Sequence, residues 1–242
     1  MNPFERALRF QADIGTDDVV LPRRRRKTAA VDVVSVSATA TAPAPAAIVA
    51  DAAHYATLAE FNQAICECQK CALGKTRNKF VFGVGNPGSK VMFIGEAPGA
   101  DEDRLGEPFV GRAGKLLDKI LAAIEFDRTN VYIANILKCR PPGNRDPEPG
   151  EMDACMPYLE RQIAMIAPAF ICCLGRIAAQ GLLRTKTPLG KMRGQWFDKY
   201  GARIMVTYHP AALLRFPDYK RDTWEDVQRL RAAYDEWKAK SS

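Results

Sequence analysis

The chain has 242 residues, 47% of them hydrophobic, which is enough to bury the core of one large domain. A formal net charge of +7 is compatible with a polyanionic partner, although charge alone is weak support for nucleic acid. No apolar run could span a bilayer, and the first residues lack the apolar segment of a secretory signal. These features argue against the membrane and secreted classes, and we expect a cytoplasmic monomer without a membrane partner.

The first 55 residues are interpreted as an N-terminal extension. A short helix is expected around 4–12, followed by the basic run Arg23–Lys27. The following stretch of alanine, valine, threonine, serine and proline has no helical or strand periodicity and is typical of a flexible tether. The basic run is either a non-specific DNA contact or a solvated charge cluster. We therefore predict an extension at 1–55 and one folded domain at 56–242.

From Thr57 onward, the sequence alternates between helical and strand patterns. Thr57 and Glu60 form a capping box that predicts the start of a helix. Four short apolar runs predict buried strands at Val91–Ile94, Val131–Ile136, Phe170–Leu174 and Ile204–Tyr208. Further helices are expected at Ala113–Ile124, Glu151–Ile166, Arg176–Leu183 and Thr223–Lys238, with extra peripheral strands at Lys79–Val84 and Gly190–Tyr200. This alternation indicates the α/β class, with a parallel sheet covered by helices on both faces.

Unusual residues follow the ends of several predicted strands. Glu96 follows the first strand, Asn135 lies at the end of the second and His209 follows the last, while Phe109 lies in the glycine-rich loop after the first. Ligands bind at this edge of parallel sheets. Asn135 offers a donor and an acceptor, Phe109 a stacking face and His209 a donor, a set that suits a planar heterocycle.

Each of these residues also has a simpler interpretation. The asparagine could be a turn residue, the phenylalanine a core residue, the histidine structural and the glutamate a helix cap. Their shared position at the strand ends favours a binding site. The glycine-rich loop lacks both common phosphate-binding patterns, so nucleotide binding is only weakly supported.

Four cysteines form the pattern C-x2-C followed by C-x15-C, at Cys68, Cys71, Cys139 and Cys155. In a chain without an export signal, cysteines are more often thiolate ligands or buried thiols than disulfides. Four thiolates can hold either a 4Fe–4S cluster or a tetrahedral zinc ion. Of the other cysteines, Cys172 and Cys173 are expected in the core, and Cys66 is a poorer competing ligand.

Several sequence blocks together resemble the signatures of family 4 uracil-DNA glycosylases, the iron–sulfur members of their superfamily. The blocks are Gly95–Gly99, Pro108–Gly114, Asn135 with Lys138–Pro142, and Tyr208–Pro210, in order within about residues 57–238. The resemblance implies an α/β/α sandwich with a central four-stranded parallel sheet. It also implies excision of uracil from single- or double-stranded DNA to leave an abasic site. Together with the cysteine spacing, it favours 4Fe–4S over zinc.

The resemblance further implies a role for each residue at the strand ends. Uracil would be flipped out of the base stack into a pocket, where Phe109 stacks on it and Asn135 bonds its N3/O4 edge. His209 would donate to O2 and stabilise the departing uracil anion. Glu96 would help to position the attacking water at C1′.

Three further residues are expected at the substrate. Gly95 and Ala97 would border the base, and Glu102 would crowd C5 of the base and so exclude thymine. The best-studied branch of the superfamily carries an aspartate where this chain has Ala97. A strong general base is therefore missing there, and the reaction would depend mainly on stabilising the leaving group.

The resemblance also implies a DNA-contacting surface. Leu213 and Leu214, followed by Arg215, look like a loop that wedges into the duplex, with core packing as the alternative for both leucines. Basic loop residues expected to contact phosphates are Lys138, Arg140, Arg145, Arg193 and Arg215. Two alternative functions stay open: a non-enzymatic DNA-binding or polymerase-associated module of the same fold, and a glycosylase for another base.

Overall fold

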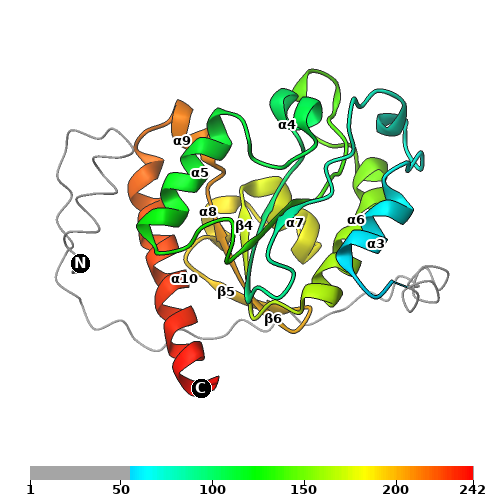
Figure 1. The fold of residues 1–242 in the computed structure, drawn as a ribbon. Coiled ribbons are helices and arrows are strands. Elements are labelled where there is room, and N and C mark those ends of the chain that lie inside the picture. Colours follow the sequence, from blue (N-terminus) through cyan, green and yellow to red (C-terminus); the bar gives the residue numbers. More distant parts are fainter. Residues whose placement is uncertain (1–54, 242) are drawn as a thin grey trace.

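A six-stranded sheet forms the centre of the computed structural model, which describes residues 55–241 (Figure 1). The strands are β1 (Val84–Gly85), β2 (Val91–Gly95), β3 (Tyr132–Asn135), β4 (Phe170–Leu174), β5 (Trp196–Lys199) and β6 (Ala202–Thr207). Their order is β1-β3-β2-β4-β6-β5, and the four central strands are parallel. The predicted four-stranded parallel sheet is confirmed, and β1 and β5 add antiparallel edges.

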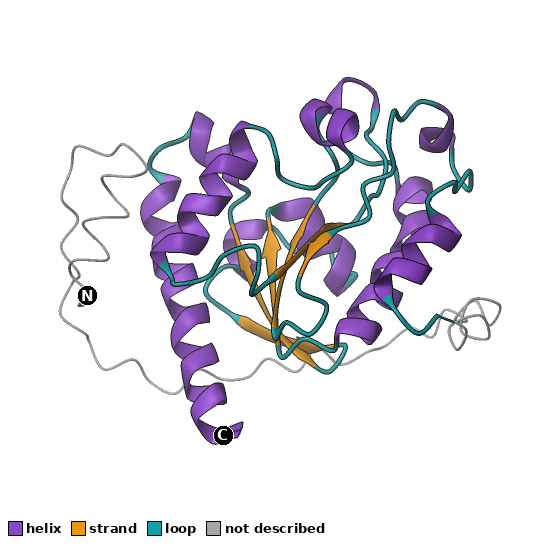
Figure 2. Cartoon of the chain, in the orientation of Figure 1, coloured by secondary structure: helices purple, strands orange, loops and turns teal. Residues whose placement is uncertain are grey.

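Helices cover both faces of this sheet (Figure 2). They are α3 (Leu58–Ile65), α4 (Ala100–Leu105), α5 (Arg112–Ala123), α6 (Pro149–Ile166), α7 (Arg176–Leu183), α8 (Leu189–Met192), α9 (Pro210–Arg215) and α10 (Tyr219–Ser241), with 3₁₀ turns at Ala72–Lys75 and Pro142–Asn144. The predicted helix start is confirmed, because the backbone N–H of Glu60 donates to Thr57 Oγ1 at 3.2 Å, but the Glu60 carboxylate accepts the N–H of Ala56 instead of closing the capping box on Thr57. Within residues 55–241, no helix combines the length and the apolar character needed to cross a membrane.

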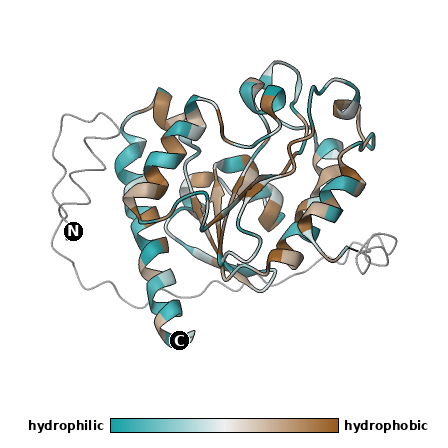
Figure 3. Cartoon of the chain, in the orientation of Figure 1, coloured by the Kyte–Doolittle hydropathy of each residue, from teal (hydrophilic) through white to brown (hydrophobic). Residues whose placement is uncertain are grey.

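Alternation along the strands explains the two faces. Met92 and Ile94 pack with α3, α6 and α7, whereas Val91 and Phe93 pack with α5 and α10. The strands are apolar over almost their whole length, as buried parallel strands are (Figure 3). Cys172 and Cys173 lie in β4 facing opposite layers, and the prediction that they belong to the core is confirmed.

The predicted peripheral strands are only partly found, and the predicted N-terminal extension is not described by the structure. The predicted strand at Lys79–Val84 is reduced to the two residues of β1, and the segment Gly190–Tyr200 contains part of α8 before β5. The expected helix at 4–12, the basic run Arg23–Lys27 and the tether lie outside the described residues. The domain boundary at 55/56 therefore stays a prediction.

The register of the sheet places the ends of the parallel strands side by side. Gly95 at the end of β2 pairs with Asn135 at the end of β3, and Leu174 pairs with Thr207 across β4 and β6. Two backbone bonds continue the ladder beyond the strands, from Ile136 N–H to Gly95 O and from Leu137 N–H to Glu96 O, both at 2.9 Å. The loops that carry the predicted site are therefore fixed to one edge of the sheet.

Candidate active site

A cavity of about 390 Å³ opens at the carboxyl edge of the parallel strands. The structure brings Glu96, Phe109, Asn135 and His209 together in its wall, although they come from three different loops and a strand end. Ala97 and Glu102 also line this cavity. The cavity wall therefore includes six of the residues predicted at the substrate, whereas Gly95 does not line it.

Asn135 presents an unpartnered acceptor to this cavity. The residue is only 2% exposed, and its Oδ1 has no hydrogen-bond partner within the described structure. A buried polar atom without a partner costs about 1–3 kcal/mol, which a ligand donor can recover. Gly95 makes room for this arrangement, since a Cβ there would lie 2.4 Å from Asn135 Oδ1 and 2.5 Å from Phe109 Cζ.

His209 is held as a neutral donor. Its Nδ1 accepts the backbone N–H of Ala211 at 3.1 Å, which caps α9 and leaves the proton of the neutral ring on Nε2. Dense protein around the ring lowers the pKa of His209 to about 4, and the charge of Arg215 acts in the same direction. The histidine is therefore uncharged at neutral pH, with a single N–H available to a ligand.

Phe109 is placed by a constrained backbone. Its φ of 56° lies in the left-handed region, which is costly for a bulky residue. A Cβ on Gly114 would lie 1.7 Å from the carbonyl oxygen of Phe109, so only glycine allows α5 to approach this loop. The ring of Phe109 faces His209, with centroids 5.5 Å apart and planes tilted by 31°.

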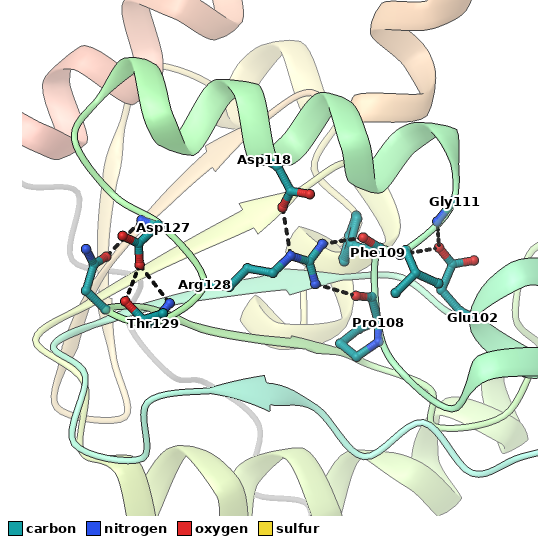
Figure 4. Close-up of polar contacts among 10 residues, drawn as sticks. Glu102, Pro108, Phe109, Gly111, Asp118, Asp127, Arg128 and Thr129 are labelled. Atoms are coloured by element: carbon teal, nitrogen blue, oxygen red, sulfur yellow. Dashed lines mark hydrogen bonds and ion pairs between the residues drawn. The ribbon is translucent and has the colours of Figure 1, made fainter.

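Polar contacts hold the Phe109 loop from two sides (Figure 4). On one side, Glu102 Oε1 accepts the backbone N–H groups of Val110 and Gly111, both at 2.9 Å. On the other, Arg128 donates to the carbonyl oxygens of Pro108 and Phe109 and is itself paired with Asp118 at 2.7 Å. We refer to Glu102, Arg128 and Asp118 as the Phe109 clamp. Sequence reasoning missed Arg128 and Asp118, because neither lies in a recognisable motif.

This arrangement bears on the role predicted for Glu102. Its second oxygen accepts the backbone N–H of Gly99 at 3.1 Å, so three backbone groups hold the carboxylate. These bonds leave it little freedom to crowd C5 of a base. The contacts favour a structural role in place of the predicted one.

Glu96 lies in a setting that favours its protonated form. Burial, together with the nearby Asp146 carboxylate, raises the pKa of Glu96 to about 7, and the charge of Arg176 opposes the shift. Arg176 is paired with Asp146 at 2.6 Å, and this ion pair reduces the effect of each charge on the pKa of Glu96. A carboxyl with a pKa near neutrality in a cavity is a common mark of a reactive site.

Two predicted phosphate contacts are wrong, because their side chains are already engaged. Lys138 is fully buried, and its Nζ donates to Asn135 O at 3.0 Å and to Gln162 Oε1 at 2.6 Å. Arg193 pairs with Asp222 and Asp226 at 2.7 and 2.9 Å. Neither cation can reach DNA without breaking these contacts.

The remaining predicted DNA contacts differ in exposure. Leu213 is 1% exposed and packs in the core, so the wedge prediction is wrong for this residue, whereas Leu214 is 43% exposed. Arg215 and Arg145 line the cavity, but Arg145 is paired with Glu151 at 2.6 Å. Of the five predicted basic residues, those left for phosphate contacts are Arg215 and the half-buried Arg140, whose Nε donates to Asn144 Oδ1 at 2.8 Å.

The cavity rim also carries Phe216, which the sequence reasoning did not single out. Its side chain is 55% exposed. An aromatic residue directly after Arg215 was the available signal, but the sequence alone does not say whether such a residue is buried.

The four predicted ligand cysteines converge from three segments. Cys68 and Cys71 flank the turn after α3, Cys139 follows β3 and Cys155 lies in α6. Burial is the main cause that raises the pKa of Cys155 to about 12; Lys138 opposes the shift, and the nearby thiols of Cys139 and Cys71 contribute to it. Hydrogen bonds reach three of the four sulfurs, from Lys138 N–H to Cys155 and Tyr158 Oη to Cys68 at 3.3 Å, and from Arg77 to Cys139 at 3.4 Å.

Within the described part of the chain, no group of three or more His, Cys, Asp or Glu side chains is arranged to hold a metal ion. Cys66 does not join the four, since its thiol donates to Gln63 O at 3.4 Å.

Comparison with known proteins agrees with this site. Residues 82–228 match the family described as the Uracil DNA glycosylase superfamily. The type-4 uracil-DNA glycosylase of Archaeoglobus fulgidus is 44% identical over 182 residues, which cover 72% of this chain and 92% of that protein. The type-4 enzyme of Saccharolobus solfataricus is 46% identical over 69% of this chain and 82% of its own. The type-4 enzyme of Thermotoga maritima is 38% identical over 71% and 91%. The chain belongs to the uracil-DNA glycosylase superfamily.

Proposed function

We propose that the protein excises uracil from DNA by hydrolysing its N-glycosidic bond, acting as a cytoplasmic monomer in base excision repair. The observation that carries this proposal is the buried, unpartnered Oδ1 of Asn135 in a base-sized cavity. Uracil presents an N3–H donor to such an acceptor, whereas cytosine presents a lone pair at N3, so the two acceptors would repel. The similarity to type-4 uracil-DNA glycosylases over most of both chains supports the same substrate.

The neighbouring residues supply the remaining chemistry. Phe109 stacks on the flipped base, and His209 donates from Nε2 to the O2 oxygen, where negative charge develops as the bond breaks. A donor of this kind typically contributes about 10²–10³ in rate. Because it is neutral, His209 stabilises the anion without transferring a proton. Glu96 positions the water at C1′, and Ala97 offers no general base beside it.

We further infer that Cys68, Cys71, Cys139 and Cys155 hold a 4Fe–4S cluster. Zinc ribbons usually pair two C-x2-C knuckles, whereas the second pair here, Cys139 and Cys155, has the spacing C-x15-C. This spacing and the resemblance to the iron–sulfur family 4 enzymes support a cluster. When bound, the cluster supplies a structural cross-link between α3, α6 and the segment after β3. Cys139 lies four residues after Asn135, so this link fixes the loop that reads the base.

The DNA would lie across the cavity rim. Of the predicted basic residues, Arg140 and Arg215 are left to contact its phosphates, and Leu214, which precedes Arg215 in the chain, is exposed. Phosphate contacts position the strand without reading its sequence.

A single assay tests the proposed activity. Purified protein is incubated with single-stranded, U:G, U:A and hypoxanthine:T oligonucleotides, and abasic sites are cleaved and resolved on a gel. We expect product from the uracil substrates and none after Asn135→Ala. Product from hypoxanthine alone would indicate a different base specificity. The absence of product from every oligonucleotide would overturn the proposal and favour the non-enzymatic alternative.

A further inference from the structure

Phe216 is an exposed aromatic residue at the mouth of the cavity. Among residues 55–241, three large apolar side chains are exposed: Leu105 at 46%, Leu214 at 43% and Phe216 at 55%. Of these three, Phe216 lines the cavity. It directly follows α9, whose first residue is preceded by the cap His209, so the short helix links it rigidly to the proposed reacting centre.

A stack of side chains supports Phe216 from behind. Its ring lies 5.5 Å from that of Tyr219, and Tyr219 is stacked on Tyr208 at 4.1 Å with an interplanar angle of 1°. The guanidinium of Arg193 lies 4.6 Å from the centre of the Tyr208 ring. Arg193 is in turn fixed by Asp226, a buried residue. These contacts connect the buried ion pair of Arg193 and Asp226 to the exposed ring of Phe216.

The backbone also fixes the position of Phe216. Its N–H donates to Ala212 O at 2.8 Å, and its carbonyl accepts the N–H of Tyr219 at 3.2 Å. The side chain is therefore exposed on an ordered support. When a partner stacks on it, the protein loses little conformational freedom.

We propose that Phe216 is a stacking platform for the nucleobase that adjoins the excised uracil on the same strand. This inference rests on the proposed function. Flipping a base out of the stack leaves its neighbour with an uncovered face, and an aromatic ring at the pocket mouth can cover that face. Stacking needs no opposite strand and accepts every base. Arg215, which precedes Phe216 in the chain and also lines the cavity, is placed for the adjoining phosphate.

Three substitutions separate stacking from simple apolar contact. Phe216→Trp keeps a ring, Phe216→Leu keeps only apolar surface, and Phe216→Ala removes both. Leu105→Ala is the matched control, because Leu105 is similarly exposed but does not line the cavity. The probe is a single-stranded oligonucleotide with non-cleavable 2′-fluoro-2′-deoxyuridine, flanked by 2-aminopurine on the 5′ side in one version and on the 3′ side in another.

We expect wild type and Phe216→Trp to quench 2-aminopurine on one side of the uracil analogue. Phe216→Ala and Phe216→Leu should lose this quenching and bind roughly 5- to 150-fold more weakly, the range for losing one stacked base. Leu105→Ala should match wild type. Wild-type quenching and affinity in Phe216→Ala would overturn the inference, and wild-type behaviour in Phe216→Leu would show an apolar wedge instead.

The same proteins are assayed for cleavage of a uracil oligonucleotide. If wild type makes no abasic sites, the proposed function fails. If wild type cleaves but the quenching does not depend on the ring at position 216, only the platform fails.

Discussion

Burial adjusts the protonation of the two titratable residues at the heart of the cavity. It raises the pKa of Glu96 to about 7 and lowers that of His209 to about 4, because burial disfavours the charged form of each. Near neutral pH the histidine is a neutral donor and the glutamate is partly ionised. The proposed chemistry requires this combination, since the anion of Glu96 would orient water while His209 retains its proton.

These values predict how activity depends on pH. The kcat/KM for uracil excision, which reflects the free enzyme, should rise with pH through about 7 as Glu96 ionises. No loss from His209 should occur above about pH 4. Glu96→Gln should give a lower, flat profile between pH 5 and 9 at constant ionic strength. Asp146→Asn removes a charge that raises the pKa of Glu96, so it should move the rise to lower pH. A rise near 7 that persists in Glu96→Gln would assign it to another group.

At the scale of elements, the loop between α4 and α5 depends on contacts from outside itself. Phe109 adopts a left-handed backbone conformation that a bulky residue rarely takes alone. The Phe109 clamp offsets this cost by fixing peptide groups on both sides of the residue. The ring is consequently positioned before a base arrives, which reduces the ordering cost of binding.

We expect Arg128→Ala to weaken base binding by loosening this loop. The inhibition constant of free uracil should rise by up to roughly 150-fold, the upper range for one stacked base. Arg128→Lys should resemble Arg128→Ala, because lysine lacks the planar fork that reaches two carbonyls. Arg104→Ala removes an exposed α4 ion pair and serves as the control. An unchanged inhibition constant in Arg128→Ala would show that the loop holds Phe109 without the clamp.

The elements of the fold were largely predictable from the sequence, whereas several contacts of their side chains were not. Short apolar runs predicted the central strands, and the helical segments between them predicted a parallel sheet, whose strands bring Asn135 and His209 to one edge. The buried partners of Lys138 and Arg193 were not predictable, because they lie 24 to 33 residues away in the chain. Leu213 and Leu214 are adjacent residues of the same type. Leu213 is buried and Leu214 is exposed because only Leu213 packs against the core, which the sequence does not show. A sequence pattern can therefore predict the residues of the site. Whether a neighbouring side chain is exposed and available to DNA depends on tertiary contacts.

For the whole molecule, the cysteines join parts that the sheet leaves separate. Cys68 and Cys71 belong to the segment before β1, Cys139 follows β3 and Cys155 lies in α6. These segments share the hydrophobic cluster that contains Met92 and Ile94. This packing and the hydrogen bonds to the sulfurs hold the four cysteines in one part of the fold, where a bound cluster would join their segments.

Replacing single cysteines tests this cross-link. Cys139→Ser and Cys155→Ser, purified without oxygen, should lose iron and acid-labile sulfide and unfold at lower temperature than wild type. Cys66→Ser is the matched control, since its thiol bonds Gln63 O and should not be needed for iron. Cys139→Ser should also weaken inhibition by free uracil, because it releases the segment that follows Asn135. Colourless, zinc-loaded wild-type protein that still excised uracil would contradict the cluster assignment, whereas iron lost equally from Cys66→Ser would place that residue among the ligands.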